Sequence, residues 1–402
     1  MHKSTTPIIS KKNLVFILGI LAALGPLSID MYLPAFAALE KVFKTDARHV
    51  QLTLSSFFVA LAFGQLAYGP LSDRYGRKPV LYVGLSIYVV ASALCIFATS
   101  IDQLIALRFF QALGASAGMV VGRAIVSDLY SARDAAGIYS TIMLVMGVAP
   151  MLAPIAGGHL VAFYGWDTIF GILAIFGALA LLLIHRNLVE TTKPNLKLQL
   201  TFSSVFQRYG ALFKNRRFLG YTLSGGLTMS SMFAYIASSP FVFIEHFGIA
   251  NDHFGWVFGI NALGFILFAQ INTQLLKVAS PIKIITIAIV AQVVFALLMI
   301  LQSWMSGELY AVAIPLFLTI ALTGLLMPNM TALGMAHFST HAGEASAFMG
   351  SIQFLIAGLV SMGTGALHSN SPLIMAFVMF SCVFASFLIF YLFCKKAKSL
   401  DL

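Results

Sequence analysis

Residues 69–79 read GPLSDRYGRKP and separate two apolar runs, residues 50–71 and 79–99. Each run is about 20 residues long, the length that an α-helix needs to cross the roughly 30 Å hydrocarbon core of a bilayer. The glycine and proline residues between the runs favour a tight turn. This stretch therefore predicts two membrane-spanning helices joined by a short, highly charged loop.

The same pattern extends along the whole chain and predicts an all-α membrane protein. Twelve apolar runs are separated by charged or Gly/Pro-containing breaks, and their length predicts twelve transmembrane helices. These runs are residues 14–36, 50–71, 79–99, 103–126, 137–162, 168–186, 218–242, 253–275, 283–303, 309–332, 342–366 and 371–394. We therefore expect two six-helix bundles, residues 1–188 and 218–402, joined by the polar linker 189–217.

The composition excludes soluble, disordered and disulfide-stabilised classes of protein. Of the 402 residues, 59% are hydrophobic and only 9% are charged, whereas soluble domains carry about 25% charged residues. The three cysteines are odd in number and lie in apolar runs, which does not fit a disulfide framework. The sequence contains no Walker loop, GxSxG elbow or zinc-ligand spacing. We therefore expect no enzymatic activity, no bound metal and no cofactor.

The positive charges predict the orientation. Most of the 24 Lys and Arg residues fall on one side of the membrane when the twelve spans alternate from an N-terminus placed inside. Cytoplasmic loops carry such an excess of positive charge, so we expect both termini to be cytoplasmic. The net charge of +10 then reflects membrane topology. We expect the lipid bilayer as a partner, and we expect no binding to nucleic acid.

One acidic residue lies deep within a predicted span. Asp30 belongs to the stretch LGPLSIDMYLP, residues 24–34. An ionisable side chain at such a depth costs at least ~2.5–3.5 kcal/mol unless it faces a polar cavity. The position predicts a carboxyl group that takes up and releases protons in a buried cavity. The alternative is a helix break at Gly25-Pro26 or at Pro34 that exposes Asp30 to interfacial water.

Arg108, in the stretch LIALRFFQALGAS, is the candidate partner of Asp30. With a rise of 1.5 Å per residue, Arg108 lies about 8 Å and Asp30 about 15 Å from the outer ends of their spans. An Arg side chain can cover much of that difference. The alternative is that Arg108 snorkels to the outer interface. Tyr32 and Gln111 flank this pair in sequence, and we expect them in the same cavity.

The loop of residues 69–79 carries more charge than orientation requires. The candidate gate residues of this loop are Gly69, Asp73, Arg74, Gly76, Arg77 and Lys78. Asp128, a carboxylate at the inner end of the fourth span, is a further candidate. An ion pair between Arg77 and Asp128 would close the cytoplasmic side in one state and break in the other. The alternative is a loop that only retains positive charge inside.

Two further groups of residues are candidates. The fifth span carries Pro150, Pro154, Gly157 and Gly158. Proline weakens a helix and glycine lets neighbouring helices approach closely, which favours a bending or sliding helix between the halves, with plain packing as the alternative. The second half has no deep acidic residue. Candidate polar residues of the cavity are Arg123, which meets Asp128 or lines the cytoplasmic cavity, and Tyr235, Ser239 and Asn261.

Together these motifs resemble the major facilitator superfamily. Gly69–Lys78 is similar to its signature loop, and Leu104–Gly114 to its fourth-span motif, which carries an arginine linked to proton transfer. Pro154–Gly158 resembles the fifth-span motif typical of antiporters. The stretches PLSIDMYLPAF, RFFQALGAS, RAIVSDLY, APMLAPIAGG and SSPFVFIEHFGI resemble, more narrowly, the bicyclomycin-resistance (Bcr/CflA) drug:proton antiporters.

The resemblance implies proton-coupled efflux of small drug-like or amphipathic molecules across the bacterial inner membrane by alternating access. It implies that Asp30 and Arg108 couple proton and substrate, and that Asp73, Arg77 and Asp128 form the cytoplasmic gate. Small-molecule cargo and protons are then the partners, the proton gradient is the energy source, and the monomer is the functional unit. An uncoupled facilitator or importer of a small metabolite is the alternative, and a non-transport membrane protein a remote one.

Overall fold

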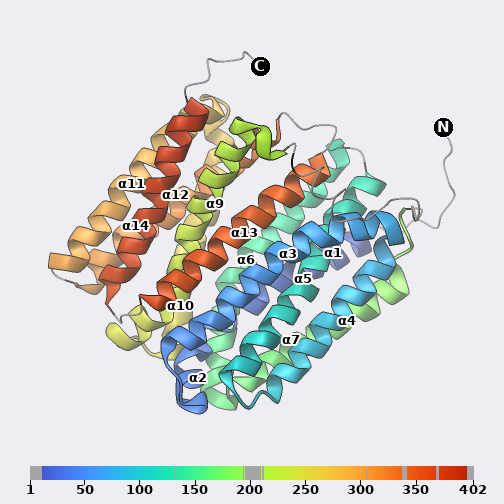
Figure 1. Ribbon diagram of the computed structural model, residues 1–402, viewed down its shortest axis with the longest axis horizontal. Helices are drawn as coiled ribbons and strands as arrows, with labels where there is room; N and C mark the ends of the chain where they lie inside the picture. The colour runs from blue at the N-terminus through green and yellow to red at the C-terminus, as the bar shows by residue number, and fades with distance from the viewer. Residues whose placement is uncertain are drawn as a thin grey trace.

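The computed structural model describes residues 11–130, 132–192, 194, 210, 212–305, 307–336, 342–367 and 371–395. Every regular element within these residues is a helix, which confirms the all-α prediction (Figure 1). Most of the predicted linker, residues 189–217, lies outside the described residues.

The helices lie close to the predicted spans. The first half contains α1 (Lys11–Asp30), η1 (Leu33–Ala35), α2 (Phe36–Phe43), α3 (Ala47–Tyr75), α4 (Arg77–Ile96), α5 (Ile101–Leu129), α6 (Ala132–Tyr164) and α7 (Asp167–Asn187). The second half contains α9 (Arg216–Ser239), η2 (Pro240–His246), α10 (Asn251–Leu275), α11 (Pro281–Met305), α12 (Leu309–Met335), α13 (Ala342–Ala366), α14 (Pro372–Ile389) and η4 (Phe390–Lys395). Among the described residues, 11 segments are long and apolar enough to cross a membrane. The predicted fifth span, α6, has the shorter apolar stretch Val148–Tyr164.

Capping side chains set several helix starts that hydropathy alone does not locate. Asp46 accepts a hydrogen bond from the backbone N–H of His49 at 2.9 Å and starts α3. Ser100 caps α5 in the same way. A side-chain oxygen at this position satisfies one of the backbone donors that a helix leaves unpaired at its first turn.

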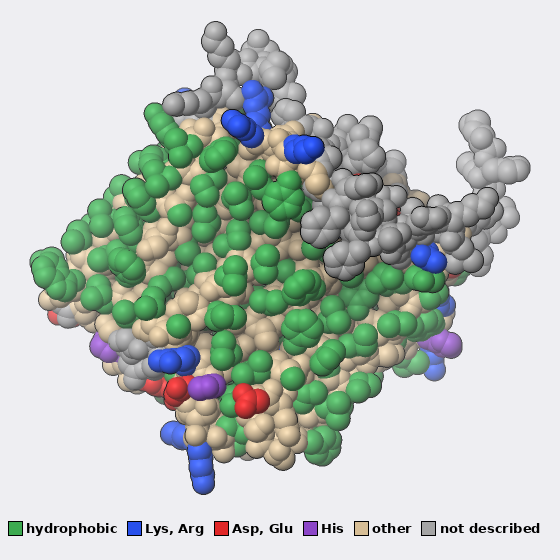
Figure 2. All heavy atoms as spheres, viewed as in Figure 1, with side chains coloured by type: hydrophobic (Ala, Val, Ile, Leu, Met, Phe, Trp, Pro, Cys, Tyr) green, Lys and Arg blue, Asp and Glu red, His purple; other side chains and the backbone are tan. Residues whose placement is uncertain are grey.

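The surface is that of a protein embedded in lipid. Figure 2 shows hydrophobic side chains over the middle of one face, with charged side chains gathered at the two ends. We call the end that carries residues 69–79 the loop end, and the end that carries η1, α2 and η2 the far end. Exposed aromatic side chains lie where four helices reach the far end, at Phe97, Tyr164, Trp304 and Tyr310. Such aromatic residues are typical of a membrane–water interface.

Two helix pairs join the first half to the second. In Figure 1, α13 lies beside α3 in the middle of the molecule, and α6 and α10 lie behind them; both pairs make extensive contacts. A Cβ atom at Gly255 of α10 would lie 2.7 Å from the backbone of Ile155 on α6. Glycine is therefore required for this close approach between the halves.

The antiparallel α3–α13 seam repeats every seven residues. Ser351 Oγ donates to the Ala62 carbonyl at 2.9 Å. Seven residues further along each helix, a Cβ atom at Gly358 would lie 3.3 Å from the carbonyl oxygen of Ser55. After seven more residues, a Cβ atom at Gly365 would lie 3.6 Å from the carbonyl oxygen of Arg48. A seven-residue repeat keeps the same faces of two helices together along their length.

Candidate functional site

Asp30 lies at a break in the first span. Helix α1 ends at Asp30, two turn residues follow, and Pro34 lies in the short helix η1. The break proposed as an alternative is therefore present, but Asp30 is only 4% exposed within the protein. The described part of the chain forms three ion pairs, and Asp30 takes part in none of them.

Arg108 is fully buried, with 0% exposure, so the snorkelling alternative is wrong. Its Nη1 donates to Gln111 Oε1 at 2.5 Å. Its guanidinium carbon lies 4.5 Å from the ring centroid of Tyr32, 4.3 Å from that of Phe57 and 5.9 Å from that of Phe170. These rings attract a cation through their negative faces. The first half thus holds Arg108 in an aromatic box.

The predicted ion pair between Asp30 and Arg108 is not formed in this structure. The depth estimate assumed a straight first span, whereas α1 ends at Asp30 and the chain turns. Arg108 Nε and Nη2 have no hydrogen-bond partner among the described residues. In the second half, the Tyr235 hydroxyl accepts a hydrogen bond from Asn261 Nδ2 at 3.2 Å.

Several polar side chains that the sequence analysis missed position this site. The Tyr32 hydroxyl bonds with Thr53 Oγ1 at 2.8 Å, and Gln111 Nε2 donates to Ser92 Oγ at 2.8 Å. Each is a polar residue within an apolar run, which is the signal that could have identified it. Tyr32 and Gln111 therefore do lie beside Arg108, and each is fixed by a hydroxyl from a neighbouring helix.

Arg77 organises the loop end. Its Nε donates to Asp128 Oδ2 at 2.9 Å and its Nη2 to Asp128 Oδ1 at 3.3 Å, so the predicted Arg77–Asp128 ion pair is confirmed. Its Nη1 donates to Asp73 Oδ1 at 2.6 Å and to Ser72 Oγ at 2.7 Å. Gly76, with a φ of 98°, ends α3 directly before Arg77. Few residues other than glycine adopt such a φ.

Glu190 is a residue of this network that the sequence analysis missed. Its Oε1 accepts from the backbone N–H of Arg77 at 2.8 Å and its Oε2 from that of Lys78 at 3.0 Å. A carboxylate at the start of α4 also compensates the positive end of the helix dipole. Thr191 Oγ1 donates to Asp128 at 3.0 Å. Glu190 belongs to the predicted linker, more than a hundred residues away in sequence, which is why spacing did not reveal it.

The other predicted gate residues lie around this network. Lys78 Nζ donates to the Leu188 carbonyl at 2.6 Å. The Arg74 guanidinium lies 5.2 Å from the centroid of the Tyr75 ring, and a Cβ atom at Gly69 would meet nothing within 4 Å. Among the predicted gate residues, Arg77 is the one whose side chain pairs with both Asp73 and Asp128.

Arg123 does not meet Asp128, and Ser239 forms a hydrogen bond within its own helix. Arg123 donates to the Met119 carbonyl at 3.2 Å and to Ser346 Oγ and Gln65 Oε1, each at 3.4 Å. It therefore bridges to the second half, and Asp128 pairs with Arg77 instead. The Ser239 hydroxyl donates to a carbonyl of its own helix.

The predicted fifth-span motif lies in α6, which continues through Pro150 and Pro154. A Cβ atom at Gly157 would meet the backbone of Met31, with Met31 Cα at 3.0 Å. Gly157 thus brings α6 against the break that follows Asp30. Among the described residues, no group of three or more His, Cys, Asp or Glu side chains could hold a metal ion.

Comparison with known proteins identifies the family. Residues 18–362 match the Major Facilitator Superfamily. The chain belongs to this superfamily. A D-xylose–proton symporter of known structure has the same fold, with a TM-score of 0.78 at 13% identity, over 95% of this chain and 97% of that one. This likeness shows the fold alone.

Two relatives within the superfamily match nearly the whole chain. The MFS-type transporter YdgK of Bacillus subtilis is 34% identical over 369 residues, 91% of this chain and 92% of the relative. The bicyclomycin resistance protein homolog of Haemophilus influenzae is 29% identical over 383 residues, 95% of this chain and 96% of the relative. The resemblance to the superfamily is thus confirmed, and the chain is a multi-pass membrane protein of a transporter superfamily.

Proposed function

We propose that this chain exports small drug-like or amphipathic molecules across the bacterial inner membrane in exchange for protons, by alternating access. The observation that carries the proposal is Asp30, a buried carboxyl group at the helix break that ends α1. A buried ionisable residue within a membrane span is costly and is characteristic of proton and substrate pathways. The relative named for bicyclomycin resistance supports a drug as cargo.

Two arrangements of Asp30 would provide the coupling. In the structure Asp30 is not paired with Arg108, and two guanidinium nitrogens of Arg108 lack hydrogen-bond partners among the described residues. An ionised Asp30 attracts Arg108 within the first half, and a protonated Asp30 releases it. Proton binding therefore shifts the balance between the two arrangements. Each proton that enters along a 100 mV potential supplies about 2.3 kcal/mol.

The same proposal covers the arrangement in the membrane. Residues 1–188 and 218–402 act as the two moving bundles, with the linker 189–217 on the cytoplasmic side and both termini cytoplasmic. The loop end is then cytoplasmic and the Arg77–Asp128 pair is its gate. The monomer is the working unit, and the proton gradient takes the place of a cofactor.

The test compares proton release in inside-out vesicles that contain a pH-sensitive dye. Wild type is expected to release protons from an energised lumen when an amphipathic drug is added, and Asp30→Asn is expected to release none. Asp102→Asn is the matched control, because Asp102 is an exposed carboxylate in the first turn of α5. Proton release by Asp30→Asn at the wild-type rate would refute the coupling. Drug flux down its gradient that ignores a proton uncoupler would favour the uncoupled facilitator.

A further inference from the structure

A hydrogen bond joins the two halves at the far end. Gln51, near the start of α3, donates from Nε2 to the Ala237 carbonyl of α9 at 3.1 Å. Gln51 is only 2% exposed. A buried amide of this kind is costly to desolvate and needs partners. The bond therefore forms only while the halves are together at this end.

The acceptor lies beside a break in α9. At Pro240 the helix changes into the wider turns of η2. Proline has no N–H, so the Ile236 carbonyl loses its usual donor, and Ser239 Oγ donates to it instead at 3.1 Å. Gln51 donates to the next carbonyl, Ala237. Neighbouring helices and serine side chains are the usual partners of backbone groups near a proline break inside a membrane.

The surroundings fix the position of Gln51. On α13, a Cβ atom at Gly365 would lie 2.6 Å from Gln51 Oε1 and 3.3 Å from Gln51 Cβ. Oε1 is buried and has no hydrogen-bond partner among the described residues. The side chain is thus held between α9 and α13, and the absence of a side chain at Gly365 leaves it room.

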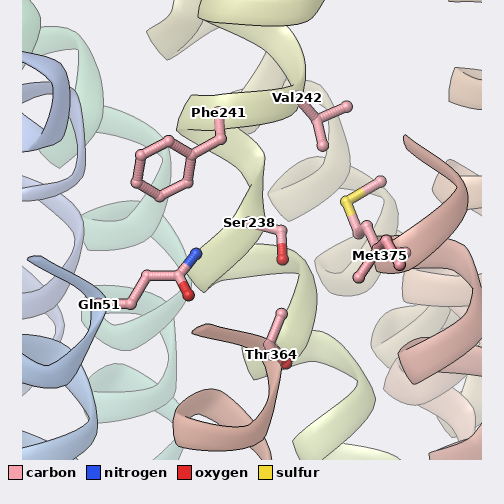
Figure 3. Close-up of a pocket in the computed structure, with 7 residues that line it drawn as sticks. Gln51, Ser238, Phe241, Val242, Thr364 and Met375 are labelled. Carbon is pink, nitrogen blue, oxygen red and sulfur yellow. The ribbon is translucent and has the colours of Figure 1, made fainter. Parts of the chain in front are cut away.

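A small cavity lies beside the amide and is lined by both halves. Figure 3 shows the Gln51 side chain extending toward Ser238, with Phe241, Val242, Thr364 and Met375 around the space. It has room for about one water molecule. The cavity interrupts the apolar packing at this point, and the hydrogen bond from Gln51 joins the two halves beside it.

We infer that Gln51 and the Pro240 break of α9 form a latch that holds the far end closed and opens whenever that end opens. The inference rests on the alternating access proposed above. Gln51 is a positioning residue in this mechanism: it sets the balance between the closed and open far end and does not contact cargo.

The test measures how fast an introduced thiol at the latch reacts. Cys95, Cys382 and Cys394 are replaced by alanine, Ser238→Cys is added, and the purified protein in detergent is labelled with a maleimide. Gln51→Leu is expected to raise the labelling rate about fivefold, which corresponds to ~1 kcal/mol, the typical net contribution of one hydrogen bond. Labelling at the parent rate in a folded Gln51→Leu protein would overturn the inference.

Gln292→Leu is the matched control. Gln292 is equally buried and donates to the Thr319 carbonyl at 2.9 Å, but within the second half. This variant is expected to lower thermal stability without changing the labelling rate. An increase equal to that of Gln51→Leu would show a general loosening and would overturn the latch.

A second variant tests the Pro240 break, the other component of the latch. Pro240→Ala returns a donor to the Ile236 carbonyl and lets α9 continue, so it is expected to raise the labelling rate as well. Combined with Gln51→Leu, it should add little, because both changes act on one contact. The inference would be overturned if Pro240→Ala alone left the labelling rate unchanged. It would also be overturned if the rate increase of the double variant equalled the product of the two single increases. Labelling requires neither cargo nor a proton gradient, so its outcome is separate from that of the proton-release test.

Discussion

Asp73 and Asp128 bind the same guanidinium, and the structure predicts different consequences for removing each charge. Asp128 accepts from two nitrogens of Arg77, whereas Asp73 accepts from one. The Asp128 side chain is 19% exposed and the Asp73 side chain 56%. The perturbation is the same substitution at both positions, Asp128→Asn and Asp73→Asn.

Burial decides the magnitude. An exposed ion pair contributes about 0–1 kcal/mol, whereas breaking a buried pair by removing one partner costs about 3–5 kcal/mol. The Arg77–Asp128 pair lies between these limits, because Arg77 is nearly buried and Asp128 partly so. A hydrogen bond to a charged group contributes about 1.5–3 kcal/mol. We therefore expect a loss of about 2 kcal/mol for Asp128→Asn and less than about 1 kcal/mol for Asp73→Asn.

The assay measures the apparent melting temperature of the purified protein in detergent. It is determined from the fraction of protein that remains monodisperse after heating. Asp128→Asn is expected to lower it at least about twice as much as Asp73→Asn, in proportion to the two free energies. Asp128→Asn should also slow drug-triggered proton release more. Equal losses, or a larger loss for Asp73→Asn, would refute the argument from burial.

Two further changes test packing and capping. Gly157→Ala is expected to lose about 1–3 kcal/mol through overpacking against the α1 break, more than the ~1 kcal/mol that alanine contributes as a better helix former. Gly363→Ala is the control, because a Cβ atom at Gly363 would meet nothing within 4 Å, and it should be neutral or stabilising. Equal melting temperatures of the Gly157→Ala and Gly363→Ala proteins would contradict the close packing of Gly157. Asp46→Ala should cost about 0.5–2 kcal/mol at neutral pH by removing the α3 cap. Hydrogen bonds from the backbone and ring of His49 lower the pKa of Asp46, so its stabilisation is lost as the pH falls from the ordinary value of about 3.9 through the lowered pKa. The difference from wild type should therefore shrink on acidification, and a constant difference from pH 7 to pH 3 would contradict the assignment.

The sequence predicted the helices and one charged contact correctly for physical reasons. A membrane requires apolar runs of a fixed length, so the span positions follow from hydropathy. Arg77 and Asp128 lie at the same ends of neighbouring spans, and topology alone brings them together. Hydropathy and topology could not predict contacts that depend on the direction of a side chain at a helix break.

Asp30 and Gln51 illustrate this limit. The partner of Asp30 was predicted from the rise of a straight helix, but α1 ends at that residue and the ion pair with Arg108 is not formed. Gln51 is an ordinary polar residue near a helix start, and its acceptor is Ala237 in the other half. Such a contact depends on how the halves dock, which no periodicity in one span contains.

The seven-residue seam between α3 and α13 restricts how this protein can change in length. Each residue of an α-helix advances by about 100° around the axis. Deleting one residue after Ser351 would turn Gly358 and Gly365 away from α3 and bring larger side chains against its backbone. Only changes of seven residues would preserve the faces in contact. Insertions and deletions in related chains should therefore fall in the connections between helices and spare the interior of these two.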